Sequence, residues 1–204
     1  MVPGLTIAFS AITLLLSLVF PLLLAIWFCR KYKAPVTTVL LGALTFLIFQ
    51  LILRIPLLRI LQSYYPGTNP NLEGWNLVFY SFFMAFTAAL FEEGGRVLVY
   101  KLFLKKKTDR INAIAFGIGH GGFEAISLVG FTYISNLMVS VMINSGMYDS
   151  MIAQYPQQED ALMQVKNTLV ETPSYMYLLG GAERIFAFLI HIGLSVLIME
   201  GIRK

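Results

Sequence analysis

The most regular feature of this chain is a set of long apolar runs separated by short polar segments. A helix needs about 20 apolar residues to cross roughly 30 Å of membrane hydrocarbon. Five runs are long enough, at residues 5–28, 36–61, 76–104, 111–143 and 175–202. The pattern predicts an all-α polytopic transmembrane helix bundle, forming a single integral membrane domain over residues 1–204. In the second run Pro56 follows Arg54, and we expect it to kink or end that helix.

Basic residues are concentrated in alternate connections between these runs. They are Arg30, Lys31, Lys33, Lys105, Lys106, Lys107 and Arg110, followed by Arg203 and Lys204 at the end of the chain. The connections at 62–75 and 144–174 are poor in basic residues. Short loops rich in Lys and Arg stay on the cytoplasmic side of a membrane. We therefore expect the N-terminus outside and the C-terminus in the cytoplasm.

The connection at 144–174 contains a further helical pattern at residues 156–171. Pro156 stands where a first helical turn accepts proline, and Glu159 and Asp160 favour the positive end of a helix dipole. Apolar residues then recur at helical spacing up to Leu169. The segment is predicted to be a short amphipathic helix, either lying on the outer membrane surface or packed as a loop helix without lipid contact.

Composition supports a membrane location. Hydrophobic residues make up 57% of the chain and charged residues 13%, whereas soluble domains have about 25% charged residues. These values exclude an ordinary soluble fold and a disordered chain. The net charge of +4 reflects the cytoplasmic loops and does not indicate nucleic acid. We therefore expect the protein to lie in a lipid bilayer. The single cysteine, Cys29, allows no internal disulfide.

Three of the five runs carry ionisable residues at positions where lipid is expected. They are Glu92, Glu93 and Arg96 in the third run, His120 and Glu124 in the fourth, and Glu183, Arg184 and His191 in the fifth. Such groups are costly in a membrane and are functional candidates by default. At about 1.5 Å per helical residue, Glu92, His120, Glu124 and His191 reach one level near the bilayer centre. Glu183 and Arg184 come near the outer interface, where we expect them to pair with each other or with outer-loop groups.

The charges of this inner group do not balance. Glu92, Glu93 and Glu124 outnumber Arg96, and hydrocarbon tolerates the excess only if carboxylates protonate or a cation enters. Two histidines and one or two carboxylates also suit zinc with an open position for water. A carboxylate that keeps its proton would solve the same problem without metal, so both readings stay open.

Three motifs in this order resemble those of the CPBP clan of intramembrane proteases. They are E-E-x-x-R from Glu92 to Arg96, F-x-x-x-H from Phe116 to His120, and His191 with Ser195 four residues later. The clan includes the CAAX prenyl endopeptidases, with PrsW and the APH subunit of gamma-secretase as more distant relatives. Together with the string from Gly117 to Glu124, the motifs look most like the YhfC branch. CPBP members usually have one more residue before the arginine, often have Asn where this chain has Ser195, and tend to continue through further helices.

The resemblance implies that the protein hydrolyses a peptide bond within the membrane, with a peptide or a membrane protein as substrate. The membrane is expected to be the bacterial cytoplasmic membrane. It assigns the action on the hydrolytic water to Glu92, His120 and His191. We expect His120 and His191 to hold Zn²⁺, with Glu124 as a candidate third ligand and Glu92 as the base. A mechanism that uses Glu and His without metal is the alternative. Glu93 and Arg96 are expected to form a pair that orients Glu92 and offsets charge.

Two other classes of function remain open. One is a non-catalytic membrane scaffold or immunity-type protein with the same fold, for which Glu92 and His120 would be dispensable. The other is a proton or metal transporter, because acid and histidine relays line such pathways. The chain lacks the repeated halves that many transporters have. The pattern leaves the oligomeric state open.

Overall fold

The fold is a set of membrane-length helices, and the computed structural model describes residues 1–64, 73–105 and 107–203. Within these residues there is no strand. Among the described residues, five helices are long and apolar enough to cross a membrane: Gly4–Tyr32, Val36–Leu61, Gly74–Phe103, Arg110–Asn144 and Ser174–Arg203. Each differs by at most a few residues from a predicted run, so the all-α bundle with five spans is confirmed. Lys106, Lys204 and the connection at 65–72 lie outside the described residues.

Three of the spans contain a π-helical segment. In chain order the elements of the first two spans are α1 (Gly4–Leu14), η1 (Leu15–Val19), α2 (Phe20–Tyr32), α3 (Val36–Phe46), η2 (Leu47–Arg54) and α4 (Ile55–Tyr64). Pro56 does not end its helix, which continues to Tyr64. Since a proline removes one backbone donor and crowds the carbonyl four residues earlier, the wider turns of η2 and η1 just before Pro56 and Pro21 relieve that conflict.

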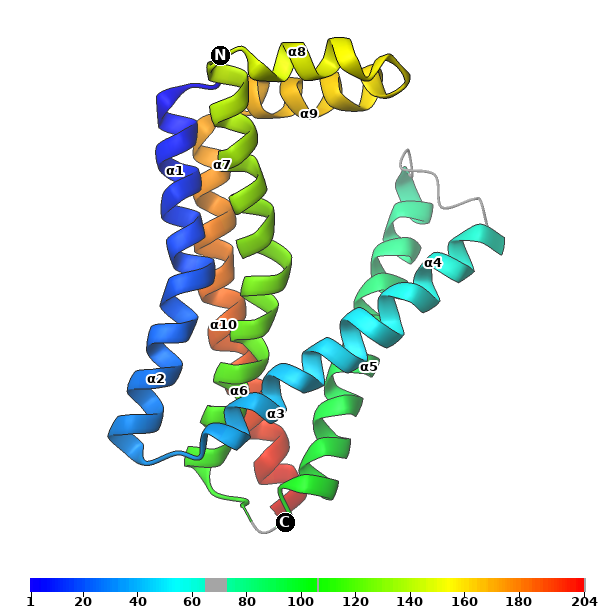
Figure 1. Cartoon of the computed structure of the whole chain (residues 1–204). Helices are drawn as coiled ribbons and strands as arrows, with labels where there is room; N and C mark the ends of the chain where they lie inside the picture. The colour runs from blue at the N-terminus through cyan, green and yellow to red at the C-terminus, as the bar shows by residue number, and fades with distance from the viewer. Residues whose placement is uncertain (65–72, 106, 204) are drawn as a thin grey trace. The chain divides into compact units, whose positions relative to one another are not determined.

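The remaining spans and the connection between the fourth and fifth spans follow. They are α5 (Gly74–Phe103), α6 (Arg110–Glu124), η3 (Ala125–Gly130), α7 (Phe131–Asn144), α8 (Met147–Gln154), η4 (Pro156–Gln158), α9 (Glu159–Glu171) and α10 (Ser174–Arg203). The predicted helix at 156–171 is present as η4 and α9. The helix α8 was not predicted, and it pairs with α9 as a hairpin (Figure 1).

The chain divides into two compact units. Unit 1 comprises residues 1–24 and 124–189, and unit 2 comprises residues 25–123 and 190–204. The expectation that residues 1–204 form a single domain stays a prediction.

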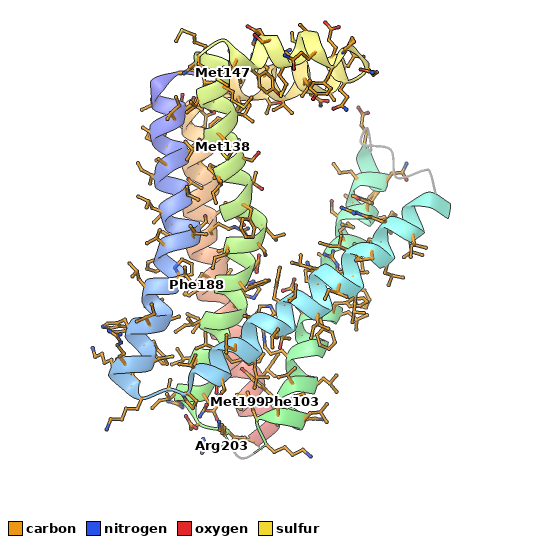
Figure 2. All side chains as sticks on the ribbon, in the orientation of Figure 1. Phe103, Met138, Met147, Phe188, Met199 and Arg203 are labelled. Atoms are coloured by element: carbon orange, nitrogen blue, oxygen red, sulfur yellow. The ribbon has the colours of Figure 1, made fainter. Side chains whose placement is uncertain are left out.

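In unit 1, α1 lies beside α7 and the first half of α10 (Figure 1). Thr6, Ser10, Thr13 and Ser17 are buried along one face of this span. The Thr13 hydroxyl donates to the Tyr177 carbonyl at 2.6 Å, and small residues of this kind let membrane helices approach closely. Phe188, labelled in Figure 2, packs edge-on against the Phe20 ring at 5.9 Å.

Within unit 1, the α8–α9 hairpin is held against the membrane-length helices by packing. Leu169 of α9 and Tyr148 of α8 are buried in the same apolar cluster as Tyr177. The Tyr177 hydroxyl donates to the Thr168 carbonyl at 3.0 Å, and Lys166 pairs with Asp149 across the hairpin at 2.5 Å. These contacts support a packed loop helix. Contact with lipid on the outer surface stays a prediction.

In unit 2, glycines bring three helices into backbone contact. A Cβ atom on Gly119 of α6 would lie 1.8 Å from the Val39 carbonyl oxygen of α3. On Gly117, a Cβ would lie 2.6 Å from the Ile192 Cα of α10. These glycines therefore fix α6 between α3 and α10. An apolar cluster that includes Met199, labelled in Figure 2, completes this packing.

Candidate active site

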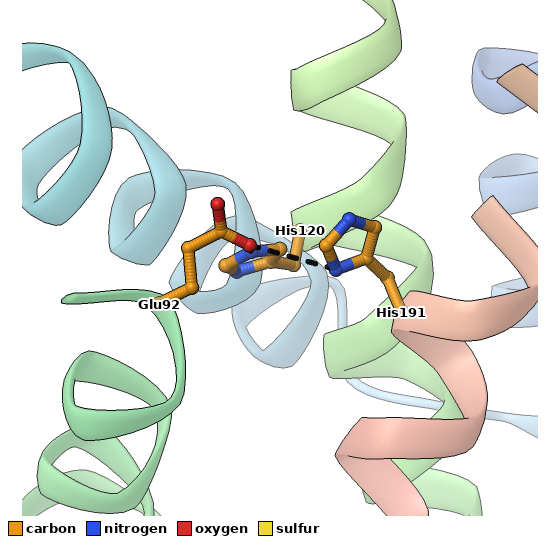
Figure 3. A group of neighbouring side chains, drawn as sticks. All are labelled: Glu92, His120 and His191. Atoms are coloured by element: carbon orange, nitrogen blue, oxygen red, sulfur yellow. Dashed lines mark ion pairs between the residues drawn. The ribbon is translucent and has the colours of Figure 1, made fainter. Parts of the chain in front are cut away.

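Glu92, His120 and His191 come together in unit 2 from three different helices, α5, α6 and α10 (Figure 3). One ligand atom from each residue lies within 4.8 Å of the others. His120 is fully buried and His191 is 8% exposed. The convergence of acid and imidazole groups that the sequence predicted is therefore present in the structure.

The spacing within this cluster fits a shared ligand. Oε2 of Glu92 lies 3.7 Å from Nε2 of His120 and 4.0 Å from Nδ1 of His191 (Figure 3). Both distances exceed a normal hydrogen bond. Two zinc ligands in a tetrahedral site lie roughly 3.3–3.6 Å apart, and two groups bridged by one water lie somewhat farther. The donor types and spacing thus fit a metal ion, and they also fit a bridging water.

Aromatic packing sets the orientation of His120. The Phe46 ring of α3 contacts the imidazole edge-on with ring centres 5.4 Å apart, and the Phe116 ring lies one turn earlier on α6 at 6.3 Å. The His191 ring lies 4.9 Å away. Because Gly119 and Gly117 hold α6 against both neighbouring helices, the imidazole is confined to this position.

Glu93 and Arg96 form the predicted pair. Nη1 of Arg96 donates to both carboxylate oxygens of Glu93, at 2.6 and 2.8 Å, and the Arg96 side chain is fully buried. The sequence-based hypothesis has this pair orient Glu92. In the structure, Arg96 also contacts His191: Nη2 of Arg96 lies within hydrogen-bond distance of Nδ1 of His191, at 3.2 Å.

This contact bears directly on metal binding. Nδ1 of a neutral imidazole has one in-plane lone pair, which accepts either a hydrogen bond or a metal ion. When Nδ1 accepts from Arg96, the proton sits on Nε2, and that tautomer offers no lone pair to a metal. A metal bound through Nδ1 therefore requires the Arg96 donor to move, whereas a metal-free Glu and His site keeps it in place.

Glu124, the candidate third ligand, has a different partner in unit 1. Its Oε1 atom accepts from Nη1 of Arg184 at 2.9 Å. Arg184 also pairs with Glu183, as the sequence predicted. The third member of the observed cluster is Glu92, and metal ligation by Glu124 stays a prediction.

The structure also shows two polar side chains that sequence reasoning did not assign to the site. Arg54 and Gln50 on η2 are 7% and 8% exposed. The signal was present, because both lie in a predicted span, where any buried polar group is a functional candidate. The sequence pattern places Arg54 only beside Pro56, where the helix is expected to kink or end.

Two ion pairs weaken the charge argument for a metal. The predicted excess of negative charge counted Arg96 as the single cation, but Arg184 also pairs with Glu124. Glu93 and Glu124 therefore each have a guanidinium partner. The negative charge that a cation would have to balance is smaller than predicted, and the case for metal depends mainly on the donor set.

Comparison with known proteins identifies the family. A family model described as YhfC intramembrane metalloprotease matches residues 15–204. This chain belongs to the YhfC family. The uncharacterized membrane protein YhfC of Bacillus subtilis (strain 168) is 32% identical over 198 residues, which cover 97% of this chain and 76% of the relative.

Membership of the YhfC family confirms the predicted resemblance. With five apolar spans, it establishes the chain as an integral membrane protein, and the bacterial cytoplasmic membrane is consistent with the relative. No solved structure matches this chain. The match covers all three motifs, and the family description names a metalloprotease without naming the metal or the substrate.

Proposed function

We propose that this protein is an intramembrane peptidase that hydrolyses a peptide bond of a peptide or membrane-protein substrate. The observation that carries the proposal is the convergence of Glu92, His120 and His191 within a buried part of three apolar helices. The description of the YhfC family supports the same reaction class.

Amide hydrolysis needs an activated water, stabilisation of the developing oxyanion and a proton for the leaving amine. Glu92 is the group suited to proton transfer, because its Oε2 atom faces both imidazoles at distances that leave room for a water. Glu92 takes the proton from the water and passes it to the leaving nitrogen. His120 and His191 hold the water in place, and the Glu93–Arg96 pair orients the His191 ring.

The two imidazoles and the Glu92 carboxylate are donor groups that suit zinc. We propose that His120 and His191 hold the zinc ion, with Glu92 beside them. When bound, zinc would lower the pKa of its water to about 7 and polarise the substrate carbonyl. The metal-free form of the same reaction is favoured by one observation, the hydrogen bond that occupies Nδ1 of His191. Both forms assign the same role to Glu92.

The test compares membranes of cells that produce the wild-type chain with membranes that contain Glu92→Gln. Mass spectrometry of new peptide N-termini should find cleavages within or beside transmembrane segments in the first sample only. Gln keeps the size of Glu92 but cannot accept the proton, so we expect a loss of at least about a hundredfold. Glu200→Gln is the matched control, because Glu200 pairs with Arg110 away from the cluster.

Cleavage that persists in Glu92→Gln would remove Glu92 from the mechanism. A wild-type chain that produces no new termini would favour the scaffold or transporter class instead. In that case His120→Ala and Glu92→Gln should leave partner binding unchanged.

A further inference from the structure

The face of the second span that touches His120 continues along the helix to two buried polar residues, Gln50 and Arg54. Gly42, Phe46, Gln50 and Arg54 recur at intervals of four along α3 and η2. Gly42 lies against the backbone of α6, and the Phe46 ring contacts the His120 imidazole. Residues four apart share a helix face, so Gln50 and Arg54 follow Phe46 on the side of the span that faces the site.

Gln50 has a buried amide oxygen that lacks a hydrogen-bond partner in the described part of the chain. This atom is Oε1, and the side chain is 8% exposed. A buried polar group without a partner destabilises a fold, and the great majority of such groups in native proteins are hydrogen-bonded. An amide group in this state is a candidate for binding a ligand.

Arg54 carries a buried positive charge that is only partly used. Nε donates to the Thr87 hydroxyl at 3.2 Å and Nη2 donates to the Met84 carbonyl at 2.7 Å. Both acceptors are neutral, and in the described part of the chain no carboxylate lies within ion-pair distance of Arg54. Thr87 and Met84 come five and eight residues before Glu92 on α5, so the guanidinium is held roughly 7–12 Å along the helix axis from Glu92.

Gln50 and Arg54 therefore lie on one side of Glu92, towards the N-terminal end of α5. A polypeptide that places its scissile bond at Glu92 and extends in this direction would pass Gln50 and Arg54. A peptide unit offers both an N–H donor and a carbonyl acceptor, which match the two halves of the Gln50 amide. The remaining N–H groups of Arg54 suit a carbonyl oxygen.

We propose that Gln50 and Arg54 are substrate-positioning residues that bind the backbone of the substrate beside the scissile bond. This inference rests on the proposed peptidase function. It also defines the substrate class, because a membrane helix satisfies its own backbone hydrogen bonds. The bound segment is therefore unwound next to the cleaved bond, and residues that weaken a helix, such as Gly or Pro, are expected there.

Gln50→Leu tests the role of the amide. Leu replaces the Gln50 amide with an apolar side chain of similar size. Because the buried oxygen without a partner is then gone, the thermal midpoint of the purified protein in detergent should rise. The KM for a fluorogenic peptide built on the strongest cleavage site of the wild-type map should rise about tenfold, with a smaller change in kcat. A structural role for Gln50 predicts the reverse, a lowered midpoint.

Arg54 is tested by a pair of variants with the same readouts. Arg54→Gln should raise KM by about tenfold or more, and Arg54→Lys should recover part of that loss because it keeps the charge. Arg59→Gln is the matched control, since Arg59 is exposed on α4 one turn away, and it should leave KM unchanged.

The outcomes separate this inference from the proposed function. Wild-type KM values in both Gln50→Leu and Arg54→Gln would overturn the inference and leave the peptidase intact. A lowered thermal midpoint in Gln50→Leu would also overturn it, and this measurement needs no substrate. Absence of any cleavage by the wild-type chain would instead remove the function on which the inference rests.

Discussion

At the scale of single residues, Arg96 connects two parts of the site through one guanidinium group. It binds both oxygens of Glu93 and reaches Nδ1 of His191. Hydrogen bonds between charged groups are stronger than neutral ones, and the Arg96 side chain is fully buried. The state of this one contact distinguishes the zinc form of the site from the metal-free form.

Metal analysis of the purified protein tests the two forms. If the zinc form holds, we expect close to one zinc per chain, reduced at least tenfold in His120→Ala because one of two imidazole ligands is lost. Glu183→Gln is the control, since Glu183 pairs with Arg184 in unit 1. Absence of zinc from both the wild-type chain and His120→Ala would support the metal-free mechanism.

At the scale of elements, close backbone contact between α3 and α6 decides where His120 stands. Gly119 lies against the Val39 carbonyl and Gly42 lies against the Phe116 carbonyl. A side chain at either position would meet backbone, which cannot rotate away as a flexible side chain can. The site is therefore built by residues that do no chemistry themselves.

Gly119→Ala tests this dependence. The added methyl group must push α3 from α6, so we expect a loss of about 1–3 kcal/mol or more in stability and a displaced His120. Thermal melting in detergent and the cleavage assay measure the two effects. Gly193→Ala is the matched control, because no atom lies within 4 Å of the position that its Cβ would take. Equal melting temperatures for both variants would contradict the packing argument.

The start of α6 depends on a cap at Asp109. Burial alone would raise the pKa of this carboxyl, but hydrogen bonds from the backbone and side-chain amides of Asn112 hold the pKa below its ordinary value. Asp109→Ala should cost about 0.5–2 kcal/mol in stability, as for other N-caps.

The pH dependence of this cap follows from the direction of the shift. A carboxyl with a depressed folded pKa stabilises the protein above its unfolded pKa of about 3.9, and the stabilisation is lost as the pH falls through the folded pKa. The difference in melting temperature between the wild-type chain and Asp109→Ala should therefore shrink below about pH 4. A difference that stays constant from pH 7 to pH 3 would contradict the role of the charge.

At the scale of the whole molecule, the orientation in the membrane follows from the distribution of basic residues. The described connection at 144–174 carries more acidic than basic residues, and Lys105 and Lys107 flank the third and fourth spans at their other ends. The prediction places the N-terminus outside and the C-terminus in the cytoplasm.

Labelling of single cysteines tests the orientation. In a chain with Cys29→Ser, a membrane-impermeant maleimide should label Glu159→Cys in intact cells. It should label Lys107→Cys only after the cells are lysed, because that residue is predicted to face the cytoplasm. The opposite pattern would invert the topology while leaving the site geometry unchanged.

The sequence by itself determined the five spans, the helix at 156–171 and the level at which Glu92, His120 and His191 meet. These follow from local properties, namely the length of apolar runs, the rise per helical residue and the cost of a charge in lipid. The helix α8 was missed because its eight residues, Met147–Gln154, are too few to show a clear period.

Only the tertiary structure decided which groups are partners. Glu124 pairs with Arg184, Arg96 reaches His191, and Arg54 donates to the Thr87 hydroxyl. Each pair joins residues more than 30 positions apart in the chain, so no spacing rule within one helix reveals it. The physical reason is that the rotation of each helix about its axis, which selects the partner, is set by backbone contacts at glycines such as Gly117 and Gly119.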